Sequence, residues 1–136
     1  MKNKPKILIF LDEEILSEAY SLEFVKFGFE VKLYKNYDNL IELVNKEKPD
    51  MVFCGTIASG EINGIEAIQI LSNNKKMRNV SIITPINLEK EQEVQSNLNL
   101  GARRFYIKEE YDPKKVAEGA KKYLVEAGKF TLKDFK

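Results

Sequence analysis

Several residues that end or follow apolar runs of this sequence could do chemistry together. Asp12 and Glu13 follow the first run and supply one or two carboxylates. Thr84 ends the fourth run with a hydroxyl, and Lys108 follows the fifth with an ammonium group, whereas Gly55 follows the third with no side chain. Ligands of an open parallel sheet bind at the carboxyl ends of its strands. These residues are therefore the candidates for a site at one sheet edge.

Short apolar runs alternate with helical patterns along the chain. A run such as Ile7–Leu11 is apolar at every position, which predicts a strand buried on both faces. Strands are predicted over residues 7–11, 30–34, 51–54, 80–84 and 103–107. Helical patterns follow them in residues 15–25, 40–44, 65–71, 89–98 and 116–124. Five strand–helix units with short loops predict an α/β domain with a parallel sheet and helices on both faces.

Individual residues predict where some helices begin and end. Asp12 and Asp38 precede helical patterns and are expected to act as N-caps. Asp112 followed by Pro113 is a stronger start signal, because proline is favoured at the first helical position. Gly28 is expected to end the first helix in a left-handed conformation.

The composition is that of one globular domain. The chain has 136 residues, of which 43% are apolar and 32% charged. It has no histidine, which excludes every His-dependent metal site, catalytic triad and phosphorelay histidine. The single cysteine, Cys54, excludes an intramolecular disulfide, and its place on a buried strand predicts core packing. The first apolar run is too short for a signal peptide or membrane span, so we expect the cytoplasm.

The charge is nearly balanced overall but uneven along the chain. The net charge is +1. Residues 1–68 hold 8 basic and 12 acidic residues, and residues 69–136 hold 14 and 9. A domain that binds nucleic acid directly would usually be more basic. The basic half offers a mild attraction to an acidic partner, although solvated helix faces are the simpler explanation.

Six stretches occur in the order and spacing of a known family. They are Lys6–Glu14, Gly28–Val31, Pro49–Gly55, Asn63–Glu66, Ile82–Thr84 and Gly101–Lys108. Over residues 5–127 the chain therefore resembles the receiver domain of bacterial two-component response regulators. The resemblance implies a flavodoxin-like fold with a five-stranded parallel sheet in the order 2-1-3-4-5. Residues 128–136 are expected to form a C-terminal tail or linker, more apolar than a frayed end.

The resemblance also implies a chemistry. In this family an aspartate at the end of the third strand accepts a phosphoryl group, and two acids after the first strand hold Mg²⁺. A Thr or Ser and a Lys then bind the phosphoryl oxygens. By position, the phosphoacceptor falls on Gly55 and the acidic pair on Leu11 and Asp12, while Thr84 and Lys108 match the family.

The residues at these positions predict a degenerate receiver. Glycine cannot supply a carboxylate nucleophile at position 55. Mg²⁺ prefers carboxylates and waters, and two of the three expected carboxylates are missing. We therefore expect no metal site, no cofactor and no enzymatic activity, and we expect Lys108 to pair with Asp12.

A shift of one residue would make Asp12 and Glu13 the acidic pair. The distance along the chain from Leu11 to Gly28 fits the family without a gap, which disfavours the shift. The shift would also leave Gly55 without a carboxylate.

Basic residues and one aromatic residue gather on the predicted fifth strand and last helix. The resemblance implies that the fourth helix, fifth strand and fifth helix form a face for docking and dimerisation. The candidate residues of this face are Arg103, Arg104, Phe105, Lys114, Lys115, Lys121 and Lys122.

Three hypotheses about function follow. The first is a phosphorylation-independent module of two-component-type signal transduction, which binds another signalling protein or an output domain and could form a homodimer. The alternative is a small-ligand or anion sensor, with the anion between Thr84 and Lys108 in the vacated pocket. An enzyme of flavodoxin-like fold ranks last, because the sequence shows no nucleophile–base pair, metal cluster or phosphate cradle.

Overall fold

The computed structural model of the chain describes residues 4–55, 64–74, 80–83, 85–86, 106–107 and 112–135. Four parallel strands form its main sheet in the order β2-β1-β3-β4. Their bounds are β1 (Lys6–Phe10), β2 (Glu30–Tyr34), β3 (Met51–Cys54) and β4 (Ser81–Ile83). The structure thus confirms the predicted order 2-1-3-4 for the first four strands.

A second, two-stranded parallel ladder pairs β5 (Pro85–Ile86) with β6 (Tyr106–Ile107). Its second strand lies within residues 103–107, where the fifth strand was predicted. The position of a fifth strand beside β4 in the main sheet stays a prediction. The helix predicted over residues 89–98 lies outside the described residues.

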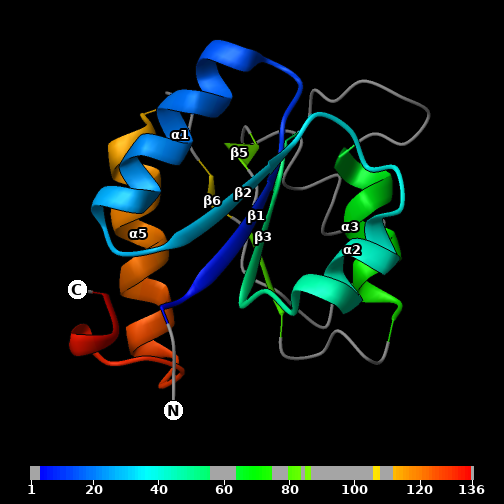
Figure 1. Cartoon of the computed structure of the whole chain (residues 1–136). Helices are drawn as coiled ribbons and strands as arrows, with labels where there is room; N and C mark the ends of the chain where they lie inside the picture. The colour runs from blue at the N-terminus through cyan, green and yellow to red at the C-terminus, as the bar shows by residue number, and fades with distance from the viewer. Residues whose placement is uncertain are drawn as a thin grey trace.

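Helices cover both faces of the sheet (Figure 1). On one face lie α1 (Glu14–Lys26) and α5 (Pro113–Glu126), and on the other lie α2 (Leu40–Glu47) and α3 (Gly64–Ser72). The side chains of β1 alternate between two separate cores. Ile7 and Ile9 belong to the cluster that includes residues of α1 and α5, and Leu8 and Phe10 belong to the cluster that includes residues of α2 and α3. A central strand with two buried faces must be apolar throughout, as predicted.

The predicted helix ends are partly confirmed. Gly28 has φ +97°, and the amides of Gly28 and Phe29 donate to the carbonyls of Val25 and Phe24, the pattern of a Schellman motif. The Asp112 side chain accepts from two backbone amides at the start of α5.

The other two predicted caps are wrong. The residues at the N-cap positions of α1 and α2 are Glu13 and Asn39, and neither makes a side-chain capping bond. Each of these helices begins one residue further along the chain than a cap at Asp12 or Asp38 would allow.

The solvent-facing side of α1 is unusually apolar. Its buried side chains are Ser17, Tyr20 and Phe24. Ile15, Leu22 and Val25, which share the helical pattern of the sequence, are 83%, 63% and 55% exposed. When apolar residues occur on every side of a helix, the sequence pattern does not indicate which side is buried. We call these three residues the α1 stripe.

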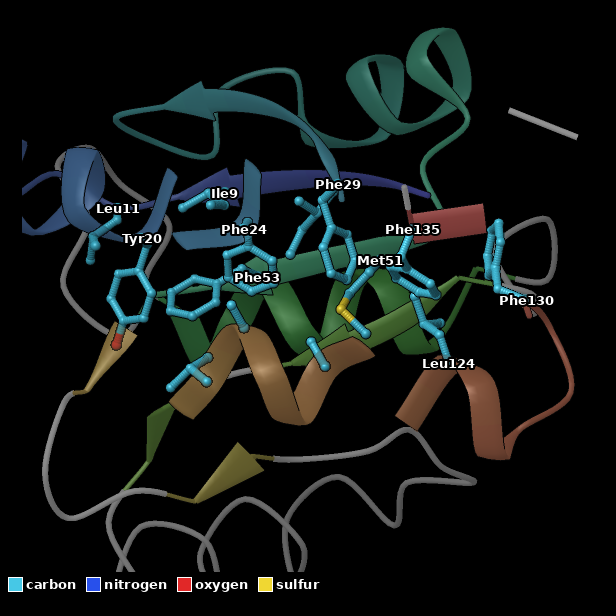
Figure 2. Packing of buried hydrophobic residues seen from close by; sticks show 14 residues of the cluster. Ile9, Leu11, Tyr20, Phe24, Phe29, Met51, Phe53, Leu124, Phe130 and Phe135 are labelled. Carbon is cyan, nitrogen blue, oxygen red and sulfur yellow. The ribbon is translucent and has the colours of Figure 1, made fainter. Parts of the chain in front are cut away.

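The C-terminal tail packs into the core beneath the amino ends of the strands. It forms a short 3-10 helix, η2 (Leu132–Phe135), and Phe130 and Phe135 are each 5% exposed within the cluster of α1 and α5. Figure 2 shows both rings at the end of the cluster opposite Leu11. Lys129 Nζ donates to Ser81 Oγ at 3.0 Å, which ties the tail to the first residue of β4. No helix of the described residues could cross a membrane, since none is both long and apolar enough.

Candidate functional site

Leu11 and Gly55 meet at the carboxyl edge of the sheet. Phe10 pairs with Cys54 in the register of β1 and β3, and the Gly55 amide donates to the Phe10 carbonyl at 2.9 Å. Leu11 is 6% exposed. A Cβ atom at position 55 would lie 2.7 Å from Leu11 Cδ1 and 2.6 Å from the Phe10 oxygen. The leucine therefore fills the space beside the glycine, and the backbone of β1 closes it.

Tyr37, in the loop between β2 and α2, holds the backbone of position 55. Its hydroxyl donates to the Gly55 carbonyl at 2.7 Å, and the side chain is buried. Its ring stacks on Phe10 with the centroids 5.0 Å apart. Burial raises the pKa of the Tyr37 hydroxyl well above its ordinary value. No local sequence pattern distinguishes this tyrosine, because its role depends on a contact with a residue 18 positions away along the chain.

Cys54 packs in the core, as predicted. It is fully buried in the cluster that includes residues of α2 and α3. Burial raises the pKa of its thiol to about 12. The thiol is therefore protonated at neutral pH and poorly suited to nucleophilic chemistry.

The acidic residues after β1 do not form a metal site with other described residues. Asp12 is half-buried, and Glu13 is exposed at the start of α1. No three His, Cys, Asp or Glu side chains of the described part of the chain lie close enough to hold a metal ion. Mg²⁺ needs several oxygen ligands in octahedral geometry, which a leucine and a glycine do not provide. Leu11 and Gly55 therefore contribute no side-chain ligand to a Mg²⁺ ion at this edge.

Some of the predicted site residues lie in parts of the chain that the structure does not describe. Thr84, Lys108, Arg103, Arg104 and Phe105 lie outside the described residues, so the pairing of Lys108 with Asp12 stays a prediction.

The lysines of α5 do not all face solvent in the same way. Lys114, Lys115 and Lys122 are exposed. Lys121 is half-buried, with its Nζ 5.4 Å from the ring centroid of Phe135 and 6.0 Å from that of Phe27. Lys121 therefore also contacts the tail, and its place on the predicted docking face stays a prediction.

A small cavity that the sequence did not predict opens beside the first turns of α1. It has a volume of about 200 Å³. Its lining comes from the end of β1, from α1 and from the end of β2. The lining residues are Leu11, Asp12, Glu14, Ser17, Glu18, Leu33, Tyr34 and Lys35. These residues are spread over three elements, so no local pattern of the sequence marks the cavity.

The comparisons with known proteins agree with this fold. A family model of the response regulator receiver domain matches residues 7–121, which is most of the chain. The chain belongs to the response regulator receiver domain family. No curated protein sequence matches the chain.

Solved structures similar to this receiver domain share its fold at low identity. The receiver domain of a histidine kinase from Syntrophus aciditrophicus is 20% identical with a TM-score of 0.74, over 93% of this chain and 94% of that one. A protein described as a response regulator, from Chloroflexus aurantiacus, is 18% identical with a TM-score of 0.75, over 90% and 99%. The Francisella response regulator 1452 receiver domain is 16% identical with a TM-score of 0.71, over 92% and 99%.

Membership in the family places this chain in two-component signalling. Receiver domains are typically signalling modules without enzymatic activity of their own, and they interact with other signalling proteins or with output domains.

Proposed function

We propose that this receiver domain transmits its signal without phosphorylation of an aspartate, by binding another signalling protein or an output domain. The observation that carries the proposal is the contact of Leu11 with Gly55 at the carboxyl edge of the sheet. A phosphorylatable receiver needs a carboxylate nucleophile and a bound cation at this edge. Here the nucleophile position has no side chain, and an aliphatic side chain lies against it.

The arrangement of the edge argues against a simple shift of the acidic pair. Leu11 is the residue that follows β1 and lies against Gly55, whereas Asp12 lies one residue further along. In this proposal Asp12, Thr84 and Lys108 have structural roles, as an ion pair and a bonded hydroxyl, and Glu13 stays in solvent.

The partner-binding face would combine the strand predicted over residues 103–107 with the exposed side of α5. The described residues of this proposed face are Lys114, Lys115, Lys121 and Lys122. Arg103, Arg104 and Phe105 would complete it and would give an acidic partner, or a second copy of the chain, both charge and an aromatic anchor.

The test of phosphorylation uses the intact chain. The protein is incubated with acetyl phosphate and Mg²⁺, in parallel with a receiver domain that keeps its aspartate, and the intact masses are measured. We expect the control to gain one phosphoryl group and this chain to gain none. A stable phosphoryl adduct on this chain would refute the proposal.

The test of partner binding compares charge variants of α5. Proteins retained by the immobilised wild-type chain are compared with those retained by a Lys114→Glu/Lys115→Glu variant and by a Lys46→Glu variant, whose change lies on α2. A partner of the proposed face is lost with the α5 variant and kept with the α2 variant. Equal retention by all three proteins would contradict this choice of face.

A further inference from the structure

The tail is anchored by two phenylalanine side chains beside the carboxyl ends of α1 and α5. Phe130 and Phe135 are each 5% exposed, whereas residues 131–133 between them are exposed. The two ring centroids lie 6.0 Å apart, and the centroid of Phe135 lies 5.4 Å from that of Phe29 (Figure 2). We call the space that these two side chains fill the tail recess. Most of the burial of the tail therefore depends on two anchors.

The recess fits the tail through contacts from three elements. A Cβ atom on Gly28 would lie 2.0 Å from the Phe135 carbonyl oxygen, so the glycine allows the tail backbone to lie directly on the end of α1. Lys121 of α5 lies over the Phe135 ring, with 5.4 Å from Nζ to the centroid. Lys129 Nζ donates to Ser81 Oγ of β4 at 3.0 Å. Together these contacts recognise one particular segment, not apolar side chains in general.

The tail also has local structure of its own. The Thr131 amide donates to Asp134 Oδ2 at 2.8 Å, and the Thr131 hydroxyl donates to the same oxygen at 3.3 Å. This is the pattern of a capping box, in which a side chain of the first turn bonds back to the residue that caps it. Both bonds lie within the tail, so its turn does not need the rest of the chain to satisfy them.

Gly128 joins α5 to the tail and has the properties of a hinge. Its φ is +74°, and a Cβ atom on it would have open space around it. In this conformation its amide donates to the Val125 carbonyl at 3.0 Å, and the chain turns back toward the recess. A helical φ at the same residue would extend α5 and carry the tail away from its own recess. One backbone rotation thus separates a docked tail from a tail that another molecule can bind.

We propose that the tail and its recess are a separable pair, and that two copies of the chain form a dimer by exchanging tails through the Gly128 hinge. Each tail contact forms between two copies as it does within one, so exchange changes only the hinge. Within one copy the tail stays near its recess at a millimolar effective concentration, which favours the closed monomer in dilute solution. The exchange needs neither residues 103–107 nor the exposed lysines of α5, so it does not rest on the proposed function.

The first experiment alters the hinge. Gly128→Val disfavours positive φ, because a β-branched residue is rarely found there. We expect the closed form to be weakened about tenfold per hinge. The dimerisation constant should therefore rise about a hundredfold, since one dimer relieves two hinges. Analytical ultracentrifugation of wild type and Gly128→Val over a series of concentrations measures both constants.

Three further variants in the Gly128→Val background identify the surface that holds the dimer. Phe130→Ala/Phe135→Ala removes both anchors and should return the chain to a monomer. Lys114→Glu/Lys115→Glu changes the proposed partner-binding face and should leave the dimerisation constant unchanged. Leu22→Glu places a charge on the α1 stripe and should also leave it unchanged, because the exchange does not use the exposed side of α1.

The second experiment separates exchange of tails from any other kind of dimer. Gly28→Ala keeps the tail but obstructs the recess, since its Cβ would meet the Phe135 carbonyl oxygen. Phe130→Ala/Phe135→Ala keeps the recess but removes the anchors. Native mass spectrometry of the two chains, mixed and separate, should show a heterodimer in the mixture and monomers of each chain alone.

A peptide of residues 128–135 probes the same recess without a second chain. Added to the Phe130→Ala/Phe135→Ala chain, it should raise the Tm, because a ligand that binds the folded state stabilises it. The same peptide with both phenylalanines replaced by alanine should leave the Tm unchanged.

Three results would overturn the inference. A Gly128→Val chain that stays monomeric up to about a millimolar would exclude exchange through this hinge. A Gly128→Val dimer that persists without both phenylalanines would assign the dimer to another surface. No heterodimer from the complementary chains, together with no effect of the peptide, would show that the recess does not accept a tail from another molecule.

Discussion

Gly55 and Leu11 fit together, because the missing side chain of the glycine leaves the space that the leucine occupies. A side chain at position 55 has no room while the leucine stays in place, because its Cβ would lie 2.7 Å from Leu11 Cδ1. The Phe10 carbonyl, 2.6 Å from the same point, adds a backbone obstacle that cannot rotate away. Restoring an aspartate at position 55 alone would therefore strain this edge, and a reversal needs changes at both positions.

Gly55→Ala is expected to destabilise the chain by about 1–3 kcal/mol, the usual cost of overpacking. The Leu11→Ala/Gly55→Ala double variant should cost less than the sum of the two single variants, because removal of the leucine frees the space. Urea unfolding of the four proteins measures this coupling. Additive costs would mean that the two residues do not compete for space.

Tyr37→Phe removes the side-chain hydroxyl that binds the backbone carbonyl of Gly55. The Gly55 carbonyl, which accepts that hydroxyl at 2.7 Å, would lose a buried hydrogen bond. We expect a loss of about 1–2 kcal/mol in the free energy of unfolding. Tyr34→Phe is the control, because that ring also stacks on Phe10, with centroids 5.0 Å apart, but is only half-buried. Similar costs for the two variants would argue against a specific role of the Tyr37 hydroxyl.

The tail and the end of α1 form one packed unit. Gly28 has φ +97°, and a Cβ atom on it would lie 2.0 Å from the Phe135 carbonyl oxygen. Phe135 meets the ring of Phe29 at 5.4 Å, and Lys121 of α5 lies over its face. We propose that residues 128–135 fold with the receiver-like part of the chain and hold α1 and α5 together.

Gly28→Ala is expected to displace the tail as well as strain the backbone. Gly128→Ala is its matched control, because Gly128 also has positive φ, +74°, but has open space around its Cβ position. Backbone strain alone costs about 1 kcal/mol in each. We therefore expect a larger loss of stability for Gly28→Ala and faster hydrogen exchange in residues 130–135. In a Phe135→Ala background the two alanine variants should cost more nearly the same amount.

The sequence predicted the elements better than their environment. The all-apolar run of β1, Gly28 and the Asp112–Pro113 pair are local signals with one physical meaning, and the structure confirms each. The face that α1 buries could not be predicted, because apolar residues surround this helix. The cavity, the bond from Tyr37 and the docking of Phe135 depend on contacts between distant segments, which no periodicity encodes.

At the scale of the whole molecule, two buried acidic groups link stability to alkaline pH. Burial raises the pKa of Cys54 from 9.0 to about 12 and raises that of Tyr37 above 10.0. An unfolded chain releases both protons near their ordinary values, so between the unfolded and folded pKa the unfolded state binds fewer protons. The contribution of these two groups to the free energy of unfolding is therefore fully present below about pH 9. It falls as the pH rises toward the pKa values of the folded state.

The free energy of unfolding should fall above pH 9 by up to about 1.4 kcal/mol per pH unit for each group. Urea unfolding at a series of pH values measures the slope. Cys54→Ala and Tyr37→Phe should each reduce this slope relative to wild type, and the two effects should not be additive, because the two side chains interact. A slope unchanged in both variants would assign the alkaline loss of stability to other residues.

Cys54 also gives the molecule a built-in reporter. Cys54 is the single cysteine of the sequence, so its thiol is the one that maleimide would alkylate. This thiol lies in the centre of the sheet and has no exposed surface. Alkylation must wait until β3 separates from its neighbours, so its rate records how often the sheet opens. A partner that clamps the domain would slow this labelling, and the mass of the intact chain would register the change without any dye, tag or engineered residue.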